Sequence, residues 1–298
     1  MRRFIKQLLI ICLILSLLLG VSTPALATTP ANVPIVVYGD TLSTDQQEEV
    51  RRLLEVDESK EVKEFYVTGE DIATYIDGDP NSNMYSSAKI VREEEGKGLT
   101  INIVTAENIT EVTTDMYKNA LLTAGVEDAT VDVASPIPVT GGSALSGIYK
   151  AYDEEGEMLD KDRMELASEE LDVATDLAER EGMDSDKVTE LLTDIKKEIA
   201  EQNPATKEDV EQIVKEQLDK LDISLSEDDR EMLTRLFEKM QDLDIDFNQV
   251  KNQLEDIAAT LKEKMDDIDV DPDFMEKVQN FFKKLFAKVS DIVARLLD

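Results

Sequence analysis

The chain has 298 residues and a formal net charge of −34, with no histidine, no tryptophan and a single cysteine, Cys12. This inventory excludes Ser-His-Asp and Cys-His nucleophilic catalysis, histidine-based zinc or copper sites and a disulfide framework. So negative a surface also repels nucleic acid over long range, which excludes nucleic-acid binding and leaves carboxylate, hydroxyl, amine and guanidinium groups as the available chemistry.

The first 27 residues have the three-part layout of a secretory signal peptide. A basic start with Arg2 and Arg3 precedes an apolar run over 8–19, and small residues around Ala27 offer a cleavage site. The apolar run is about 12 residues long, well short of the roughly 20 that a membrane-spanning helix needs. We therefore expect residues 1–27 to be removed and the mature protein to be secreted without its cysteine.

Residues 28–140 are expected to form an α/β domain. Alternating apolar residues and β-branched side chains predict strands over 35–38, 62–67, 85–91, 99–104 and 129–133. Helices are predicted after Ser43, which opens a capping box, and over 114–124, which ends at Gly125. The order strand, helix, strand occurs twice, so we expect a sandwich of two βαβ-like units with helices on one sheet face. A hairpin through 96–98 is expected to join the units.

Residues 141–271 are expected to form an acidic helical region. Strand signals disappear there, and apolar residues recur with helical periodicity. Helices are predicted over 143–153, 158–181, 185–202, 206–221, 226–242 and 246–265. The predicted fold class is therefore α+β: a sandwich of about five strands, followed by an all-helical region that ends in an amphipathic helix over 272–298.

The stretch 116–152 resembles the YpuA-like family of exported Gram-positive proteins. The resemblance is carried by Met116-Tyr117, Asn119-Ala120-Leu121, Thr123-Ala124-Gly125-Val126, Asp128-Ala129, Ala144-Leu145, Gly147-Ile148 and Lys150-Ala151-Tyr152. It extends more loosely over about 33–265. The family is classed as a domain of unknown function, so the resemblance implies an envelope or extracellular protein and supplies no catalytic residues.

Two acidic loops resemble the opening of a calcium-binding loop. Their candidate ligands are Asp77, Asp79 and Asn81 in the first loop, and Asp242, Asp244 and Asp246 in the second. Both loops lack the glutamate that closes an EF-hand at position twelve, and the run Asp267–Asp273 fails the same test. We expect no cofactor and at most loose Ca²⁺ binding, with the first loop exposed and Asp246 capping a helix.

Two further motifs match catalytic patterns only in part. Ser86 and Lys89 have the Ser-x-x-Lys spacing of penicillin-recognising enzymes, but residues three apart on a strand face opposite sides. The loop 140–143 lacks the Lys-Ser/Thr ending of a phosphate loop, so we expect a turn in which Ser143 caps the next helix. No catalytic or cofactor-binding residue is predicted.

The most distinctive feature is the basic amphipathic helix predicted over 272–298. Its apolar residues repeat at helical spacing and include half of the phenylalanines in the chain. The expected contact residues are Phe274, Phe281, Phe282, Leu285, Phe286, Val289, Lys283 and Lys284. Such a helix either lies in an anionic membrane surface or binds a partner, or it docks on the acidic helices of its own chain.

The sequence favours a secreted, non-enzymatic cell-envelope protein. We expect it to act by contact with an envelope protein, a wall polymer or an anionic membrane surface. One alternative is a carboxylate-dependent hydrolase of wall polysaccharide, because the many acidic residues offer numerous carboxylate pairs. The other alternative is a low-affinity extracellular Ca²⁺ binder.

Overall fold

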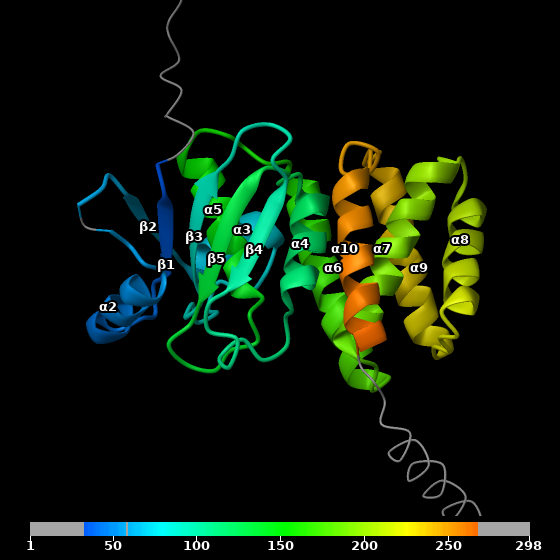
Figure 1. The fold of residues 1–298 in the computed structure, drawn as a ribbon, viewed down its shortest axis with the longest axis horizontal. Coiled ribbons are helices and arrows are strands. Elements are labelled where there is room, and N and C mark those ends of the chain that lie inside the picture. Colours follow the sequence, from blue (N-terminus) through cyan, green and yellow to red (C-terminus); the bar gives the residue numbers. More distant parts are fainter. Residues whose placement is uncertain (1–32, 58, 268–298) are drawn as a thin grey trace, which may run out of the picture.

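The computed structural model describes residues 33–57 and 59–267, and it confirms the α+β fold class. A five-stranded mixed sheet comes first, and a group of helices lies beside it (Figure 1). The predicted signal peptide over 1–27 and the predicted terminal helix over 272–298 lie outside the described residues.

The sheet has the strand order β2-β1-β3-β5-β4. The strands are β1 (Ile35–Gly39), β2 (Lys63–Val67), β3 (Ser87–Arg92), β4 (Leu99–Ile103) and β5 (Ala129–Ala134). β1 pairs with β2 in parallel, and β4 pairs with β5 in parallel. β3 lies between these pairs and runs antiparallel to both β1 and β5. Two βαβ units are therefore present, and β3 joins them.

The predicted hairpin between β3 and β4 is wrong. Gly96 and Gly98 have φ values of 83° and 80°, so the chain does turn between these strands. However, β5 lies between β3 and β4 and pairs with both. The register places Val131 of β5 opposite Ile90 on one side and Ile101 on the other. These three buried side chains therefore share one face of the sheet.

Helices cover both faces of the sheet, whereas we expected them on one. The helices α4 (Thr114–Ala124) and α5 (Ser143–Glu154) contribute to the same apolar cluster as Ile35 and Val37. The helix α2 (Thr44–Leu53) packs on the opposite face, where Val50 meets Val36 and Tyr38. Successive residues of β1 are all buried, so both of its faces are apolar and both need a covering helix.

A short helix, α3 (Gly69–Ile76), was not predicted. Its signals are present: Thr68 and Asp71 form a capping box, and Ile72 is buried. The helix begins at Gly69, and this glycine made the helical pattern hard to recognise in the sequence. A Cβ atom on Gly69 would lie 2.1 Å from the carbonyl oxygen of Pro80, so only glycine lets the following loop pass this close.

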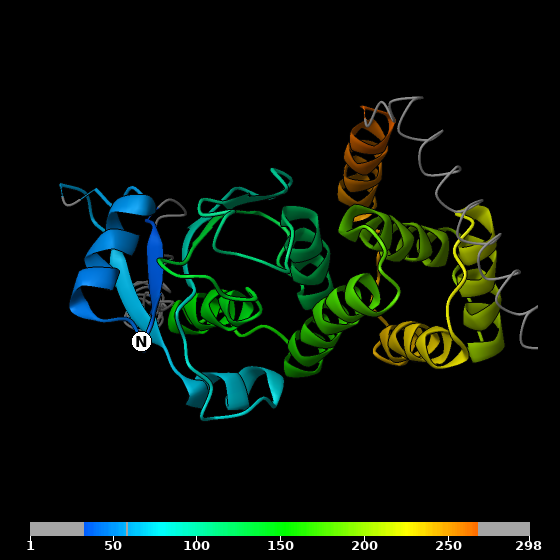
Figure 2. The same ribbon diagram turned by 90° about the horizontal axis from the view of Figure 1, so that it is seen from below.

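The remaining helices form the acidic region. They are α6 (Lys161–Arg180), α7 (Ser185–Gln202), α8 (Lys207–Lys220), α9 (Glu227–Asp242) and α10 (Lys251–Asp267). α6 packs against α7 and α9, α8 packs against the same two helices, and α10 packs on α7 (Figure 2). α10 begins at Lys251 and not at 246, because residues 247–250 form a turn. Among the described residues, no helix combines the length and the apolar character that a membrane span requires.

The sheet and the helical region meet at α4. This helix packs on β4 on one side and on α6 and α7 on the other. α5, which follows the boundary expected at residue 140, packs on β1, β2 and β3. The buried apolar residues form one cluster that extends from Ile35 in β1 to Leu261 in α10. The two halves therefore share a core.

Candidate functional site

The first predicted calcium loop uses its acidic groups within the loop itself. Asp77 ends α3 with a φ of 52°. The Oδ1 atom of Asp79 accepts hydrogen bonds from the backbone N and from Nδ2 of Asn81, both at 2.9 Å. These bonds lower the pKa of Asp79. Asp77, Asp79 and Asn81 are exposed, as expected for this loop.

The second loop behaves in the same way. Asp242 is ion-paired with Lys207 at 3.1 Å, and Asp244 has a φ of 52°. Asp246 Oδ1 accepts two hydrogen bonds from Asn248, at 3.0 Å each. Within the described part of the chain, no three acidic side chains are grouped so that they could hold a metal ion.

The two partial motifs do not form catalytic sites. Lys89 Nζ lies 2.8 Å from Asp132 Oδ2, whereas the Ser86 hydroxyl is buried and has no hydrogen-bond partner among the described residues. Gly142 precedes α5 and no side chain caps this helix, so the expectation that Ser143 is its N-cap is wrong. Gly141 has a φ of 111° and fits against Tyr117, whose hydroxyl donates to the Gly141 carbonyl. The loop is thus a packed turn.

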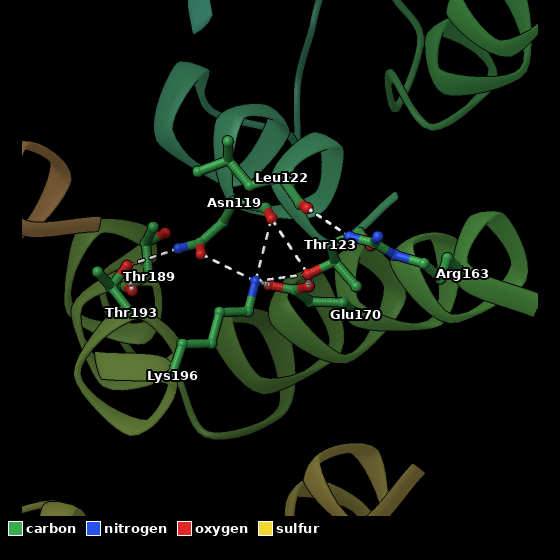
Figure 3. A network of polar contacts seen from close by, with 8 residues as sticks. All are labelled: Asn119, Leu122, Thr123, Arg163, Glu170, Thr189, Thr193 and Lys196. Atoms are coloured by element: carbon green, nitrogen blue, oxygen red, sulfur yellow. Dashed lines mark hydrogen bonds and ion pairs between the residues drawn. The ribbon is translucent and has the colours of Figure 1, made fainter. Parts of the chain in front are cut away.

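A buried polar network lies where α4 meets α6 and α7 (Figure 3). At its centre, Lys196 Nζ lies 2.5 Å from Glu170 Oε1. The same ammonium group donates to Thr123 Oγ1 at 2.7 Å, and to Oδ1 and the carbonyl oxygen of Asn119 at 3.0 Å each. Thr123 Oγ1 in turn donates to Glu170 Oε2 at 2.6 Å. All four side chains are buried.

The network continues along α7. Asn119 Nδ2 donates to Thr193 Oγ1 at 2.6 Å, and Thr193 Oγ1 donates to the carbonyl oxygen of Thr189 at 2.7 Å. Phe247 covers the ammonium group, since Lys196 Nζ lies 5.6 Å from the centroid of its ring. The polar groups of Lys196, Glu170, Thr123 and Asn119 are buried and paired with one another, so the cluster joins the two halves of the fold.

Burial sets the electrostatics of this network. Loss of solvation lowers the pKa of Lys196, and the charge of Glu170 opposes this shift. The pKa of Tyr149 is raised by its burial and by the nearby Glu170 carboxylate. An ion pair taken out of water contributes little net stability, but loss of one partner leaves a buried charge alone. The pair therefore specifies how α4, α6 and α7 meet.

A small hollow opens beside this network, and we call it the Arg163 hollow. It lies between the end of α4, the start of α6 and the loop from α9 to α10, and its volume is about 150 Å³. Arg163 and Glu127 line it together with Asp244 and Asp246 of the second predicted calcium loop. Arg163 Nε donates to the carbonyl oxygen of Thr123 at 2.8 Å, which caps the end of α4.

A larger groove of about 680 Å³ lies between α8 and α9. Its charged lining residues are Glu211, Lys215, Glu227, Arg230, Glu231, Arg235 and Glu238. Positive and negative groups alternate there, and Arg235 pairs with Glu231 at 3.3 Å. The groove is therefore polar and of mixed charge, and it offers no broad apolar floor.

The exposed surface of the described residues carries few large apolar side chains. Tyr66 is 50% exposed, Val104 40% and Met158 83%. They come from three separate places: β2, the residue after β4, and the loop before α6. These three side chains therefore do not make up one contiguous apolar patch.

The buried network was not among the sites predicted from the sequence. In α7, Thr189, Thr193 and Lys196 recur at helical spacing beside the apolar residues, which is the one signal that indicated a shared polar face. Asn119 and Thr123 belong to the stretch that carries the family resemblance. The expected contact residues Phe274, Phe281, Phe282, Leu285, Phe286, Val289, Lys283 and Lys284 lie outside the described residues.

Comparison with known proteins bears out the resemblance. The family described as "Protein of unknown function (DUF1002)" matches residues 38–257. The chain is also similar to "Uncharacterized protein YpuA" of Bacillus subtilis (strain 168), with 32% identity over 283 residues, 93% of this chain and 95% of that protein. No solved structure matches the chain.

Proposed function

We propose that this chain, which belongs to the DUF1002 family of proteins of unknown function, is an exported protein of the cell envelope. In this proposal residues 1–27 direct secretion, and residues 272–298 attach the protein to the anionic outer face of a membrane. The folded body between them acts by contact, without a cofactor.

The observation that supports attachment is the polar surface of the body. A basic, phenylalanine-rich amphipathic helix is stabilised only where its apolar face is covered. The large apolar side chains exposed on the described residues are three, Tyr66, Val104 and Met158, and they lie on different elements. These three side chains do not form one apolar face on the body, and the boundary between lipid headgroups and acyl chains supplies one.

Charge supports the same arrangement. The whole chain carries a net charge of −34, whereas the segment 272–298 has a net charge of +1, from four acidic residues and five cations: Lys277, Lys283, Lys284, Lys288 and Arg295. Each basic residue near an anionic leaflet contributes about 1 kcal/mol to binding. The acidic body is repelled by the same surface. The helix would therefore lie in the surface and hold the body away from it.

Fractionation of Gram-positive cells into medium, wall and membrane tests this proposal. The full chain is expected in the membrane fraction, and a chain that ends at residue 272 is expected in the medium. Substitution of the exposed body residues Lys97 and Lys262 by Glu provides a control that should fractionate like the full chain. Equal fractionation of the full and shortened chains would contradict attachment by this segment.

A second candidate function, hydrolysis of wall polysaccharide, rests on the groove between α8 and α9. Its volume of about 680 Å³ lies in the range of ligand-binding clefts, about 300–1,000 Å³. Glu227 and Glu231 are among its lining residues. Release of soluble fragments from purified walls, lost in Glu227→Gln and in Glu231→Gln, would support this function. If the parent protein releases no soluble fragments from purified walls, hydrolysis of wall polysaccharide is excluded.

A further inference from the structure

The Arg163 hollow has the size of a site for a very small molecule. Its volume of about 150 Å³ gives room for about five water molecules at roughly 30 Å³ each. Leu122, Phe247 and Val250 are buried and provide an apolar base. Phe247 also lies over the ammonium group of Lys196, and Arg163 bonds the carbonyl oxygen of Thr123. The hollow therefore adjoins the buried network.

One wall of the hollow carries a guanidinium group. Arg163 Nε and Nη2 donate to the carbonyl oxygens of Thr123 and Leu122, at 2.8 and 3.2 Å (Figure 3). These bonds use two of the five N–H groups of the side chain. None of the described carboxylates forms an ion pair with it. Arg163 is thus fixed in place as a cation whose remaining N–H groups suit an anionic ligand group.

The other walls carry carboxylates. Glu127 comes from the turn between α4 and β5, and Asp244 and Asp246 come from the loop between α9 and α10. A simple anion in the hollow would meet three carboxylates, and a simple cation would meet the guanidinium group. A molecule that carries both an anionic and a cationic group can pair with the guanidinium group and with a carboxylate at the same time.

We propose that the Arg163 hollow binds a small zwitterion of the free α-amino-acid class. Its carboxylate would be held by Arg163, since a guanidinium group binds a carboxylate through two parallel hydrogen bonds. Its ammonium group would pair with a carboxylate of the other walls, which carry Glu127, Asp244 and Asp246. The volume restricts the ligand to a short side chain. This proposal concerns the folded body and is independent of the membrane attachment proposed for 272–298.

Isothermal titration calorimetry of the full mature chain tests the proposal. The probes are glycine, L-alanine, glycinamide, which has no carboxylate, and N-acetylglycine, which has no ammonium group. We expect saturable binding of glycine or alanine, and at least tenfold weaker binding of both blocked probes. Equal binding of a blocked probe, or no saturable binding of glycine and alanine, would overturn the proposal.

Two variants locate the binding. Arg163→Lys keeps the charge but loses the planar fork, and Asp244→Asn with Asp246→Asn removes two carboxylates that are exposed and outside the core. Both should weaken glycine binding at least tenfold. Arg180→Gln, on the same helix and 58% exposed, is the matched control and should bind like the parent. Since the aspartate variant leaves the core intact, unchanged binding by it would refute the assignment even if the arginine variant did not fold.

Discussion

Lys196 and Glu170 form an ion pair of 2.5 Å in which both side chains are buried, at 0% and 1% exposure. Glu170 lies on α6 and Lys196 on α7, and both groups bind Thr123 of α4. Three helices are thus joined at one point, where the helix next to the sheet meets the helical region. A charged pair in such a place favours one way of packing more than it adds stability.

Removal of one partner should therefore lower the free energy of unfolding strongly, whereas removal of both partners should lower it much less. Lys196→Met leaves the Glu170 carboxylate buried without a counterion, and we expect a loss of about 3–5 kcal/mol in the free energy of unfolding. The double variant Lys196→Met with Glu170→Leu should recover most of this loss. Urea unfolding followed by circular dichroism measures both.

The matched control is Lys220→Met, which removes an ion pair with Asp194 at a side chain that is 60% exposed. Exposed pairs contribute about 0–1 kcal/mol, so this variant should unfold close to the parent. A Lys196→Met protein as stable as the Lys220→Met protein would show that the buried pair is not needed for the junction.

A second prediction concerns Gly141. An alanine there would adopt a φ of 111°, and its Cβ would lie 2.7 Å from Tyr117 Oη. Overpacking of a well-packed core costs about 1–3 kcal/mol, and the backbone strain adds to this. Gly156→Ala is the control, because Gly156 has a φ of 78° but no atoms within 4 Å of an added Cβ. Thermal unfolding should show a clearly larger loss for Gly141→Ala, and equal losses would contradict the packing argument.

Alkaline pH should destabilise the fold through its buried tyrosines. Burial raises the pKa of Tyr152 to about 12 from an ordinary value of 10.0. Burial also raises the pKa of Tyr38, Tyr75, Tyr117 and Tyr149. Between pH 10 and 12 the folded protein therefore holds protons that the unfolded chain has lost. The free energy of unfolding must then fall as the pH rises, by up to about 1.4 kcal/mol per pH unit for each such tyrosine.

Absorbance of tyrosinate and urea unfolding at pH 9 to 11 measure this effect. In Tyr152→Phe the fall in stability with pH should be less steep, because one of the titrating groups is absent. Ionisation of the five tyrosines near pH 10, while the protein stays folded, would contradict the prediction.

Calcium should associate with the acidic surface diffusely. No group of three acidic residues is arranged for a metal ion within the described residues, but the net charge of −34 attracts divalent cations. Calorimetric titration with Ca²⁺ should show weak binding that disappears in about 0.15 M salt, since screening acts over about 8 Å there. The variant Asp242→Asn with Asp246→Asn should behave like the parent. A stoichiometric, salt-resistant site lost in this variant would contradict the expectation.

Local signals in the sequence predicted most elements of the fold. Ser43 and Gln46 form the expected capping box of α2, and Gly125 ends α4 with a φ of 91°. Such caps depend on residues a few positions apart, so the sequence contains them directly. The same holds for the parallel pairs β1 with β2 and β4 with β5, which follow from the order strand, helix, strand.

Pairing and burial across long distances could not be predicted in this way. Val131 pairs with Ile90 and Ile101, and nothing near Gly96 or Gly98 indicates that β5 will separate the strands they connect. Charged residues are rarely buried unless they are paired, and no local signal marks Glu170 and Lys196 as a buried pair. Their partners lie 26 to 77 residues away in the chain, so only the folded structure brings them together.

Residues 272–298 are proposed to bind an anionic membrane surface. Cosedimentation of the mature chain with phosphatidylglycerol and phosphatidylcholine vesicles measures this binding. We predict binding to the anionic vesicles, at least about tenfold weaker for Lys283→Glu with Lys284→Glu and lost for Phe281→Ser with Phe282→Ser. Lys97→Glu with Lys262→Glu should bind like the parent. A parent protein that stays in the supernatant with both vesicles, or a phenylalanine variant that binds like the parent, would contradict the claim.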